Sequence, residues 1–144
     1  LFNLEQTAHS PHYYYHKFDP EDQKSHRRSV YRFVVRSQPN PFMTTLDCAD
    51  SSQSTPRRNE TLTALQALSL LNNKFTLSMS QHFAERLTKE GKGSGYQIKA
   101  GFKLVAGRSP NPEEYQLLVQ YEEKHGMANL CRSLFSLSEF AFID

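Results

Sequence analysis

The clearest pattern of hydrophobic and polar positions runs from residue 63 to residue 87. Apolar residues recur there first at three-residue steps and then at four-residue steps, as Leu65, Leu68, Leu71, Phe75, Met79, Phe83 and Leu87. Both spacings place side chains on one face of an α-helix. We therefore predict two consecutive helices that supply the middle of the core.

Capping residues mark the ends of these two helices. Thr63 and Gln66 have the spacing of a capping box, in which each side chain binds the backbone amide of the other residue. Asn72 and Asn73 interrupt the apolar pattern. Because asparagine tolerates the left-handed end of one helix and also caps the next, we predict the turn of a helix–turn–helix pair at these residues.

Three further helical segments are predicted in the C-terminal half of the chain. The first ends at Gly107, and the second begins at Asn111 and Pro112, with Glu114 at its third position, and stops at Gly126. The apolar faces of the three segments are formed by Ile98, Phe102, Val105, Ala106, Tyr115, Leu118, Tyr121, Met127, Leu130, Cys131, Leu134 and Phe135.

The N-terminal part of the chain is less regular. Residues 1–26 are polar and aromatic with two prolines, so we predict an extended arm. Residues 27–36 alternate in a way typical of a short strand or extended segment, and residues 41–46 fit one helical turn. The predicted fold is mainly α: a compact bundle of about five helices with an extended, loop-rich N-terminal segment. Residues 27–144 would form a single helical domain.

Length and composition add a few constraints. A chain of 144 residues is enough for one domain that buries roughly 70% of the surface of its unfolded form. A net charge of +2 does not by itself indicate a polyanionic partner, and no apolar run approaches the ~20 residues of a membrane span. The two cysteines, Cys48 and Cys131, leave open either a disulfide or two buried thiols. Because the sequence opens without Met or a leader, we expect it to be part of a longer protein.

Histidines gather in the N-terminal arm. His9, His12 and His16 lie close together beside three consecutive tyrosines, and imidazole is the commonest ligand of transition metals. These histidines are therefore a candidate metal site. Their spacing fits no established ligand pattern, however, and Pro11 disfavours a helix that would place His12 and His16 on one face. We favour an aromatic arm lying across the helical body.

Basic residues dominate the segment between Asp22 and Asp47, which contains no carboxylate. The segment carries Lys24, Arg27, Arg28, Arg32 and Arg36. Basic residues interleaved with aromatic ones are typical of proteins that bind single-stranded nucleic acid, so residues 27–36 are a candidate surface of that kind. The alternative, which we favour because the rest of the chain restores the charge balance, is that these arginines pair with Glu60, Glu85, Glu113 or Glu114.

Several linked motifs carry a resemblance to a known family. RRSVYRF, LDCAD, RRN, TALQALSLLN, VAGRSPNPEE and NLCRSLFSLSEFAFID occur in this order. Together they resemble the planctomycete-specific C-terminal domain, a family of unknown function whose members usually end large exported proteins with an upstream planctomycete cytochrome c domain. The resemblance covers residues 27–144 and leaves residues 1–26 outside. It implies a periplasmic or extracellular location, and partners among the other domains of the same polypeptide, a cytochrome c domain included.

The resemblance implies no catalytic residues. The polar positions that recur in the family include Arg108 and three positions with a capping explanation, Gln66, Asn72 and Glu139. Five others also recur: Arg28, Asp47, Asp50, Arg57 and Arg58. They are our candidates for a ligand-binding site, although an ion-pair network that orders the irregular segment is favoured. Two loop carboxylates are too few for a calcium site, which needs six or more oxygens.

We therefore expect a non-catalytic helical scaffold or interaction module. The haem-attachment pattern Cys-x-x-Cys-His is absent from the sequence, so we expect no cofactor in this chain, and any haem c would belong to an upstream domain. An enzyme or ligand-binding domain that acts on polysaccharide through the Arg/Asp site is the alternative. Binding of single-stranded nucleic acid through residues 27–36 is a further alternative, which we do not favour.

Overall fold

A computed structural model of the chain describes residues 4–6, 11–23, 26–31, 35, 38–49, 53–54, 61, 63–91 and 93–141. The chain forms two compact units, Leu1–Ser69 and Leu70–Asp144. The boundary that the sequence suggested, between an arm of residues 1–26 and one helical domain, stays a prediction. The predicted mainly α fold is confirmed: α2 to α6, defined below, are the helices of eight or more residues in the described part.

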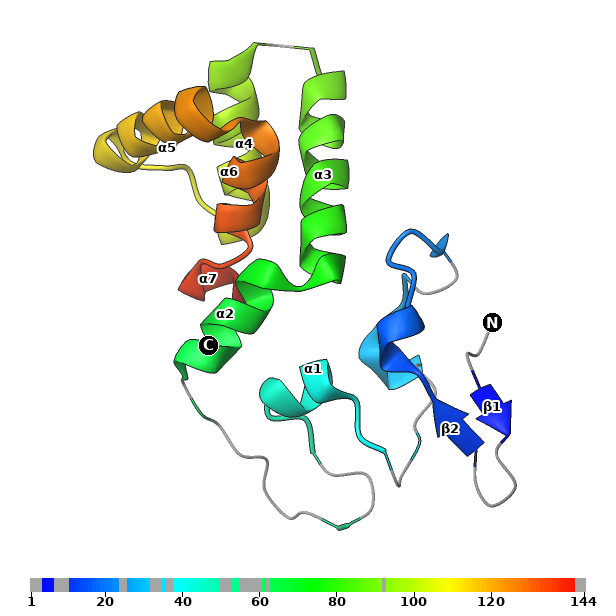
Figure 1. Ribbon diagram of the computed structural model, residues 1–144. Coiled ribbons are helices and arrows are strands. Elements are labelled where there is room, and N and C mark those ends of the chain that lie inside the picture. The colour runs from blue at the N-terminus through cyan, green and yellow to red at the C-terminus, as the bar shows by residue number, and fades with distance from the viewer. Residues whose placement is uncertain are drawn as a thin grey trace. The chain divides into compact units, whose positions relative to one another are not determined.

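The first unit begins with a short hairpin. Strands β1 (Leu4–Gln6) and β2 (Pro11–Tyr13) pair antiparallel, with Leu4 opposite Tyr13. The 3₁₀ turns η1 (Tyr15–Lys17) and η3 (Ser29–Tyr31) follow (Figure 1). The described part of the N-terminal segment thus consists of a short hairpin, 3₁₀ turns and irregular chain, as expected for a loop-rich segment.

Helix α1 (Pro41–Thr45) confirms the single helical turn predicted at residues 41–46. Asn40 caps it, because the Asn40 side-chain oxygen accepts hydrogen bonds from the backbone amides of Phe42 and Met43 at 3.0 and 3.3 Å. Pro41 occupies the first helical position, where its fixed φ suits the helix and its missing amide costs nothing.

The strand predicted at residues 27–36 is wrong at Ser29–Tyr31, which form η3. The backbone amide of Tyr31 donates to the carbonyl oxygen of Arg28 at 3.0 Å, so the chain satisfies this group locally. A strand would need a neighbouring strand to bind its backbone groups, whereas a turn needs none. Residues 32–34, 36 and 37 of the predicted strand lie outside the described part of the chain.

The predicted break between two helices is confirmed. Helix α2 (Ala64–Asn72) starts with the capping box, in which the Gln66 amide donates to Thr63 Oγ1 at 3.2 Å and the Thr63 amide donates to Gln66 Oε1 at 3.0 Å. Helix α3 (Lys74–Lys89) starts at its N-cap Asn73, whose side chain accepts from the Phe75 amide at 2.8 Å.

The apolar face predicted for α2 is wrong at its first turns. Leu65 is 62% exposed and Leu68 is 55% exposed, whereas Gln66 is buried. Successive residues of an α-helix are about 100° apart, so a helix that buries Gln66 turns Leu65 and Leu68 outward. The hydrogen bonds of Gln66 therefore decide which face of α2 is covered, against the hydrophobic pattern.

The second unit contains α3, α4 (Ser94–Ala106), α5 (Pro112–His125), α6 (Met127–Leu134) and α7 (Ser138–Ala141). Helices α3 and α4 run antiparallel, and α6 packs against both (Figure 1). Helix α5 packs against α4 and α6, and α7 contacts α4. The glycines predicted to end α4 and α5 do so: Gly107 has φ of 73° and Gly126 has φ of 80°, values that favour glycine.

The core of the second unit lies where α3, α4 and α6 meet. Its fully buried side chains, each at most 3% exposed, are Leu87, Ile98, Phe102, Leu130, Cys131 and Leu134. A methyl group on Gly101 would lie only 2.8 Å from Leu87 Cδ1 and 3.7 Å from Leu134 Cδ1. The absence of a side chain at Gly101 therefore lets α4 approach α3 closely.

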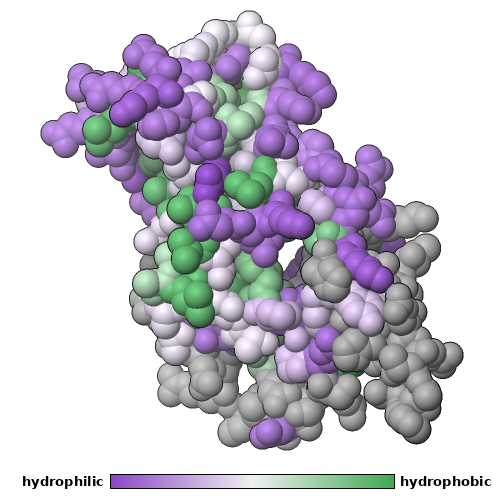
Figure 2. All heavy atoms as spheres, viewed as in Figure 1, coloured by the Kyte–Doolittle hydropathy of each residue, from purple (hydrophilic) through white to green (hydrophobic). Residues whose placement is uncertain are grey.

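Helix α5 lies at the surface, because none of its residues is fully buried. Hydrophilic residues cover its outer part in the space-filling view, whereas hydrophobic residues gather around α2 and α7 (Figure 2). Within the described residues, no helix is long and apolar enough to cross a bilayer.

Truncating Leu87 to alanine should destabilise the second unit by about 2–5 kcal/mol, since the change removes fully buried atoms and leaves a cavity between α3, α4 and α6. Leu117→Ala, the same change at a side chain that is 66% exposed on α5, should alter stability by no more than about 0.5 kcal/mol. Urea unfolding followed by circular dichroism measures both. Equal effects of the two substitutions would contradict this assignment of the core.

Candidate functional site

The carboxylate of Asp47 is the centre of a polar cluster in the first unit. Its Oδ2 accepts hydrogen bonds from the backbone amide of Thr61 at 2.7 Å, from Thr61 Oγ1 at 2.7 Å and from Gln66 Nε2 at 2.9 Å. Gln66 Nε2 also donates to Thr61 Oγ1 at 2.9 Å. Because Asp47 follows α1 and Gln66 lies in the first turn of α2, the cluster joins the two helix ends.

The local backbone explains why aspartate suits this position. Asp47 has φ of 55°, a left-handed value that aspartate tolerates better than most residues. Both polar atoms of the Gln66 side-chain amide form hydrogen bonds, because Oε1 completes the capping box while Nε2 binds Asp47. No buried side-chain nitrogen or oxygen in the described part of the chain lacks a hydrogen-bond partner.

The structure tests only part of the predicted Arg/Asp site. Asp47 binds Thr61 and Gln66, as described above, and Arg28 is exposed. Asp50, Arg57 and Arg58 lie outside the described residues. A ligand-binding site formed by these five residues therefore stays a prediction, and so does pairing of Asp47 or Asp50 with Arg57 and Arg58.

The predicted metal site also stays a prediction. His9 and the side chains of His12 and His16 lie outside the described part of the structure. Among the side chains that are described, no group of three or more His, Cys, Asp and Glu residues is placed to hold a metal ion.

Arg27 and Arg28 form none of the expected ion pairs within the described part of the first unit, and their pairing with Glu85, Glu113 or Glu114, which belong to the second unit, stays a prediction. Both side chains are exposed, and in the described part of the first unit neither guanidinium has a hydrogen-bond or ion-pair partner. Two of the glutamates proposed as partners have other neighbours: Glu114 binds Arg108, and Glu85 lies 3.9 Å from His82. Lys24, Arg32, Arg36 and Glu60 lie outside the described residues.

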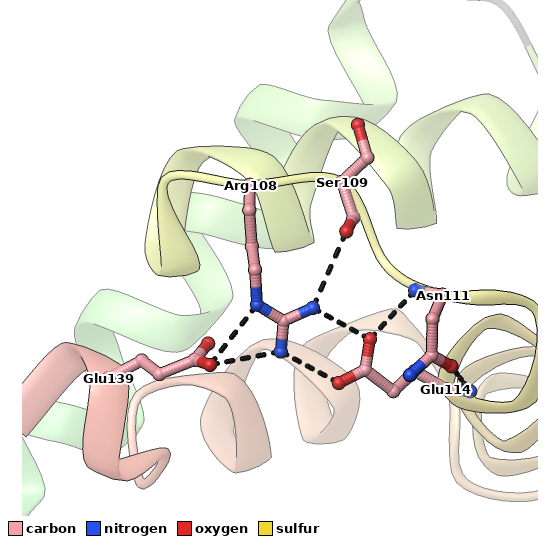
Figure 3. A network of polar contacts seen from close by, with 5 residues as sticks. All are labelled: Arg108, Ser109, Asn111, Glu114 and Glu139. Atoms are coloured by element: carbon pink, nitrogen blue, oxygen red, sulfur yellow. Dashed lines mark hydrogen bonds and ion pairs between the residues drawn. The ribbon is translucent and has the colours of Figure 1, made fainter.

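A second polar network surrounds Arg108, directly after α4 (Figure 3). Arg108 Nη1 and Nη2 donate to the two carboxylate oxygens of Glu114 at 2.8 and 2.7 Å, in the bidentate geometry typical of strong Arg–carboxylate pairs. Arg108 Nε and Nη2 both donate to Glu139 Oε1, at 3.1 and 2.9 Å. One guanidinium thus joins the end of α4 to the start of α5 and to α7.

Glu114 has a second role, because it completes the capping box of α5. Its Oε2 accepts from the Asn111 amide at 2.7 Å, and its own amide donates to Asn111 Oδ1 at 2.8 Å. The hydrogen bonds from Arg108, followed by the one from the Asn111 backbone, lower the pKa of Glu114 to about 2. Hydrogen bonds to the carboxylates of Glu114 and Glu139 raise the pKa of Arg108. The guanidinium carbon of Arg108 also lies 5.0 Å from the centre of the Phe102 ring.

The sequence identified these residues but not their pairing. Arg108 and Glu139 are among the polar positions that recur in the family, and Glu114 is predicted as a capping residue and as one possible partner of the arginines in residues 27–36. A usable signal was present, since Arg108 stands between a helix-ending glycine and the N-cap Asn111. This short connection brings the arginine within reach of the next helix start. Glu139, 31 residues away, had no such signal.

A second arginine, Arg132, is also held inside the second unit. Arg132 Nε donates to the carbonyl oxygen of Leu71 at 2.8 Å, and Nη2 donates to Asn72 Oδ1 at 2.6 Å. Arg132 therefore satisfies the C-terminal end of α2, a helix end whose carbonyl groups lack partners within the helix. Asn72, expected only to end the helix, also contributes this side-chain contact.

A shallow depression lies between α3 and α6. Its lining residues are Gln81, Ala84, Glu85, Thr88, Lys89 and Ala128. Glu85 is its one carboxylate, so the depression does not supply the paired acids that hydrolysis of a glycosidic bond ordinarily uses.

The two cysteines are free thiols in different settings. Cys48 is exposed, whereas Cys131 is fully buried in the core of the second unit. Burial raises the pKa of the Cys131 thiol to about 12, since the interior disfavours the charged thiolate. Cys131 is thus protonated at neutral pH and acts as a small apolar side chain.

Comparison with protein families identifies the chain. The sequence model of one family, PSD1, described as a protein of unknown function (DUF1553), matches residues 3–122. The chain belongs to the PSD1 family. The match includes most of the N-terminal segment, so our expectation that residues 1–26 lie outside the family is wrong. The PSD1 match ends within α5, before α6 and α7.

No curated protein and no solved structure matches the chain. The PSD1 assignment therefore supplies a family without an assigned activity, and the functional argument depends on the geometry of this chain.

Replacing Glu114 with glutamine should lower the free energy of unfolding near neutral pH. It should also make this free energy less dependent on pH in the acidic range. Because the pKa of Glu114 is lower in the folded than in the unfolded chain, its carboxylate stabilises the fold fully above its usual pKa of 4.5. This stabilisation is lost as the pH falls towards about 2. The urea midpoints of wild type and Glu114→Gln, measured across this range, should converge on acidification.

Glu113→Gln provides the matched control, because Glu113 is the neighbouring first-turn carboxylate and is exposed. Glutamine at position 114 can still complete the capping box, so the comparison isolates the charge. A Glu113→Gln effect as large as that of Glu114→Gln would contradict the role assigned to the Arg108 network.

Iodoacetamide should modify Cys48 in the folded protein and leave Cys131 unmodified, since Cys131 is buried and protonated. Intact mass spectrometry counts the added groups, and the same reaction in urea should modify both thiols. The variant Cys48→Ser should stay unmodified until it unfolds. Equal rates for the two thiols in the folded protein would show that Cys131 is accessible.

Proposed function

We propose that this PSD1-family chain is a non-catalytic helical scaffold or interaction module. One observation carries the proposal: the carboxylate with the strongest claim to chemistry, Asp47, holds two helix ends together through Thr61 and Gln66. The Arg108 network supports the same interpretation, because it joins three helices through groups that bind one another.

The geometry of Asp47 counts against the alternative of an enzyme that acts on polysaccharide. A general acid, general base or nucleophile needs an oxygen directed at the substrate. Asp47 Oδ2 is directed instead at three donors of the protein itself. Removing Asp47 would therefore break the link between α1 and α2.

We further propose that the chain forms the C-terminal end of a large exported protein associated with cytochrome c. The support is the resemblance to the planctomycete-specific C-terminal domain. The location would then be periplasmic or extracellular, and the partners would be other domains of the same polypeptide. Since Cys-x-x-Cys-His does not occur in this sequence, haem c would be held by an upstream domain.

The native polypeptide that contains this chain should be much larger than 144 residues and should absorb as a haem protein. Intact mass and the haem absorbance of the polypeptide purified from its source measure both properties. An amine-reactive cross-linker should then join exposed lysines of this chain, such as Lys103 and Lys124, to the haem-bearing domain.

The recombinant chain alone is the control and should show no haem absorbance. A haem-free native polypeptide would overturn the association with cytochrome c. A haem-bearing polypeptide without cross-links to this chain would overturn the proposed scaffold role beside that domain.

A further inference from the structure

The turn at residues 27–31 exposes every one of its side chains. Arg27, Arg28 and Ser29 are exposed, Val30 is 74% exposed and Tyr31 is 72% exposed. In the described part of the first unit, neither Arg27 nor Arg28 has a partner for its guanidinium. Arg108 and Arg132, by contrast, bind carboxylate, carbonyl or amide oxygens of the protein. Within the described part of the first unit, the donors of Arg27 and Arg28 are therefore not used.

The backbone of the turn presents these side chains in different directions. The Tyr31 amide donates to the Arg28 carbonyl oxygen and closes a 3₁₀ turn, which has three residues per turn. Side chains at neighbouring positions therefore point about 120° apart. Arg28 and Tyr31, three positions apart, lie on the same side of the turn, with Arg27 and Val30 next to them in the sequence.

The combination of residue types indicates a protein partner. Arginine and tyrosine are enriched among the residues that contribute most to protein–protein binding, and exposed apolar side chains need a pocket to leave water. A planar guanidinium binds carboxylate in a bidentate manner, as Arg108 does with Glu114 inside this chain.

Nucleic acid fits the turn less well. Proteins that bind single strands combine a basic groove with several aromatic platforms for successive bases. The described turn offers one aromatic ring, that of Tyr31, and Val30 has no stacking role. The exposure of Val30 fits contact with an apolar site on a protein partner better than contact with nucleic acid.

We propose that residues 27–31 form a recognition turn for an acidic protein segment. Arg27 and Arg28 bind carboxylates of the partner, and Val30 and Tyr31 contact an apolar site of the partner next to these carboxylates. This inference rests on the proposed role as an interaction module and names its surface and the chemistry of its partner.

A display library of short random peptides, selected against the full chain, tests the proposal. The selected peptides should combine Asp or Glu with a large apolar residue, and fluorescence anisotropy should show binding that weakens as salt is added. The double variant Arg27→Ala/Arg28→Ala should bind them at least about tenfold more weakly, because it removes the charge-assisted hydrogen bonds. Tyr31→Ala should weaken binding without changing its dependence on salt.

The double variant Lys103→Ala/Lys124→Ala is the matched control. It removes the same charge from exposed positions of α4 and α5, and binding should stay within about twofold of wild type. All of the substituted side chains are exposed, so circular dichroism and urea unfolding should show that each variant folds.

Three results would overturn the proposal. The first is a selection that yields no acidic peptides, and the second is equal weakening by the arginine and lysine double variants. The third is tighter, Arg27- and Arg28-dependent binding of single-stranded oligo-dT than of the selected peptides. Selected peptides that bind elsewhere on the chain would remove the recognition turn but leave the interaction module standing, whereas the native-polypeptide experiment tests that broader role independently.

Discussion

The close contact of α3, α4 and α6 is the constraint on which the second unit depends. Leu87, Leu134 and Cys131 occupy the junction, and Gly101 has no side chain that would displace the end of Leu87, which a Cβ atom would approach to 2.8 Å. Protein interiors are packed as densely as organic crystals, so such a junction has few alternative arrangements. This junction sets the position in space of the C-terminal end of α4, and therefore the position of Arg108 in relation to α5 and α7.

Polar contacts at helix ends have a large share in the rest of the architecture. Asp47 and Gln66 join α1 to α2, Arg132 binds the last residues of α2, and Arg108 joins α4, α5 and α7. Helix ends present backbone groups without partners, which makes them the natural places for such contacts. In this chain the polar groups beside helix ends are thus mostly bound to the protein, and the arginines of the turn at residues 27–31 stand apart from them.

Local signals in the sequence predicted what local physics determines. The caps at Thr63, Asn73 and Asn111 and the stops at Gly107 and Gly126 depend on neighbours within a few residues, and all five are confirmed. The burial of α2 depends on Gln66 meeting Asp47, 19 residues away, and no periodicity of leucines contains that information. The strand predicted at residues 27–36 had the residue types of a strand, but Ser29–Tyr31 close a local turn instead.

For the candidate site, too, the sequence predicted local features but not the contacts between distant residues. Asp47 was identified from its place in a recurrent motif, but its partners Thr61 and Gln66 were not, because hydrogen bonds across a loop leave no pattern of their own. The Arg108–Glu114 pair could have been found from the short connection between two capped helices, whereas Glu139 joins it only through tertiary packing.

The exposed position of α5 has a consequence for the motions of the folded protein. No residue of α5 is fully buried. A glycine with positive φ lies in each of the two connections of α5, Gly107 in the one that precedes the helix and Gly126 in the one that follows it. Stability within a protein is not uniform, and segments with little buried surface open at a lower free energy than the core. Local opening of α5 should therefore cost less free energy than unfolding of the core formed by α3, α4 and α6, and the Arg108–Glu114 pair opposes this opening.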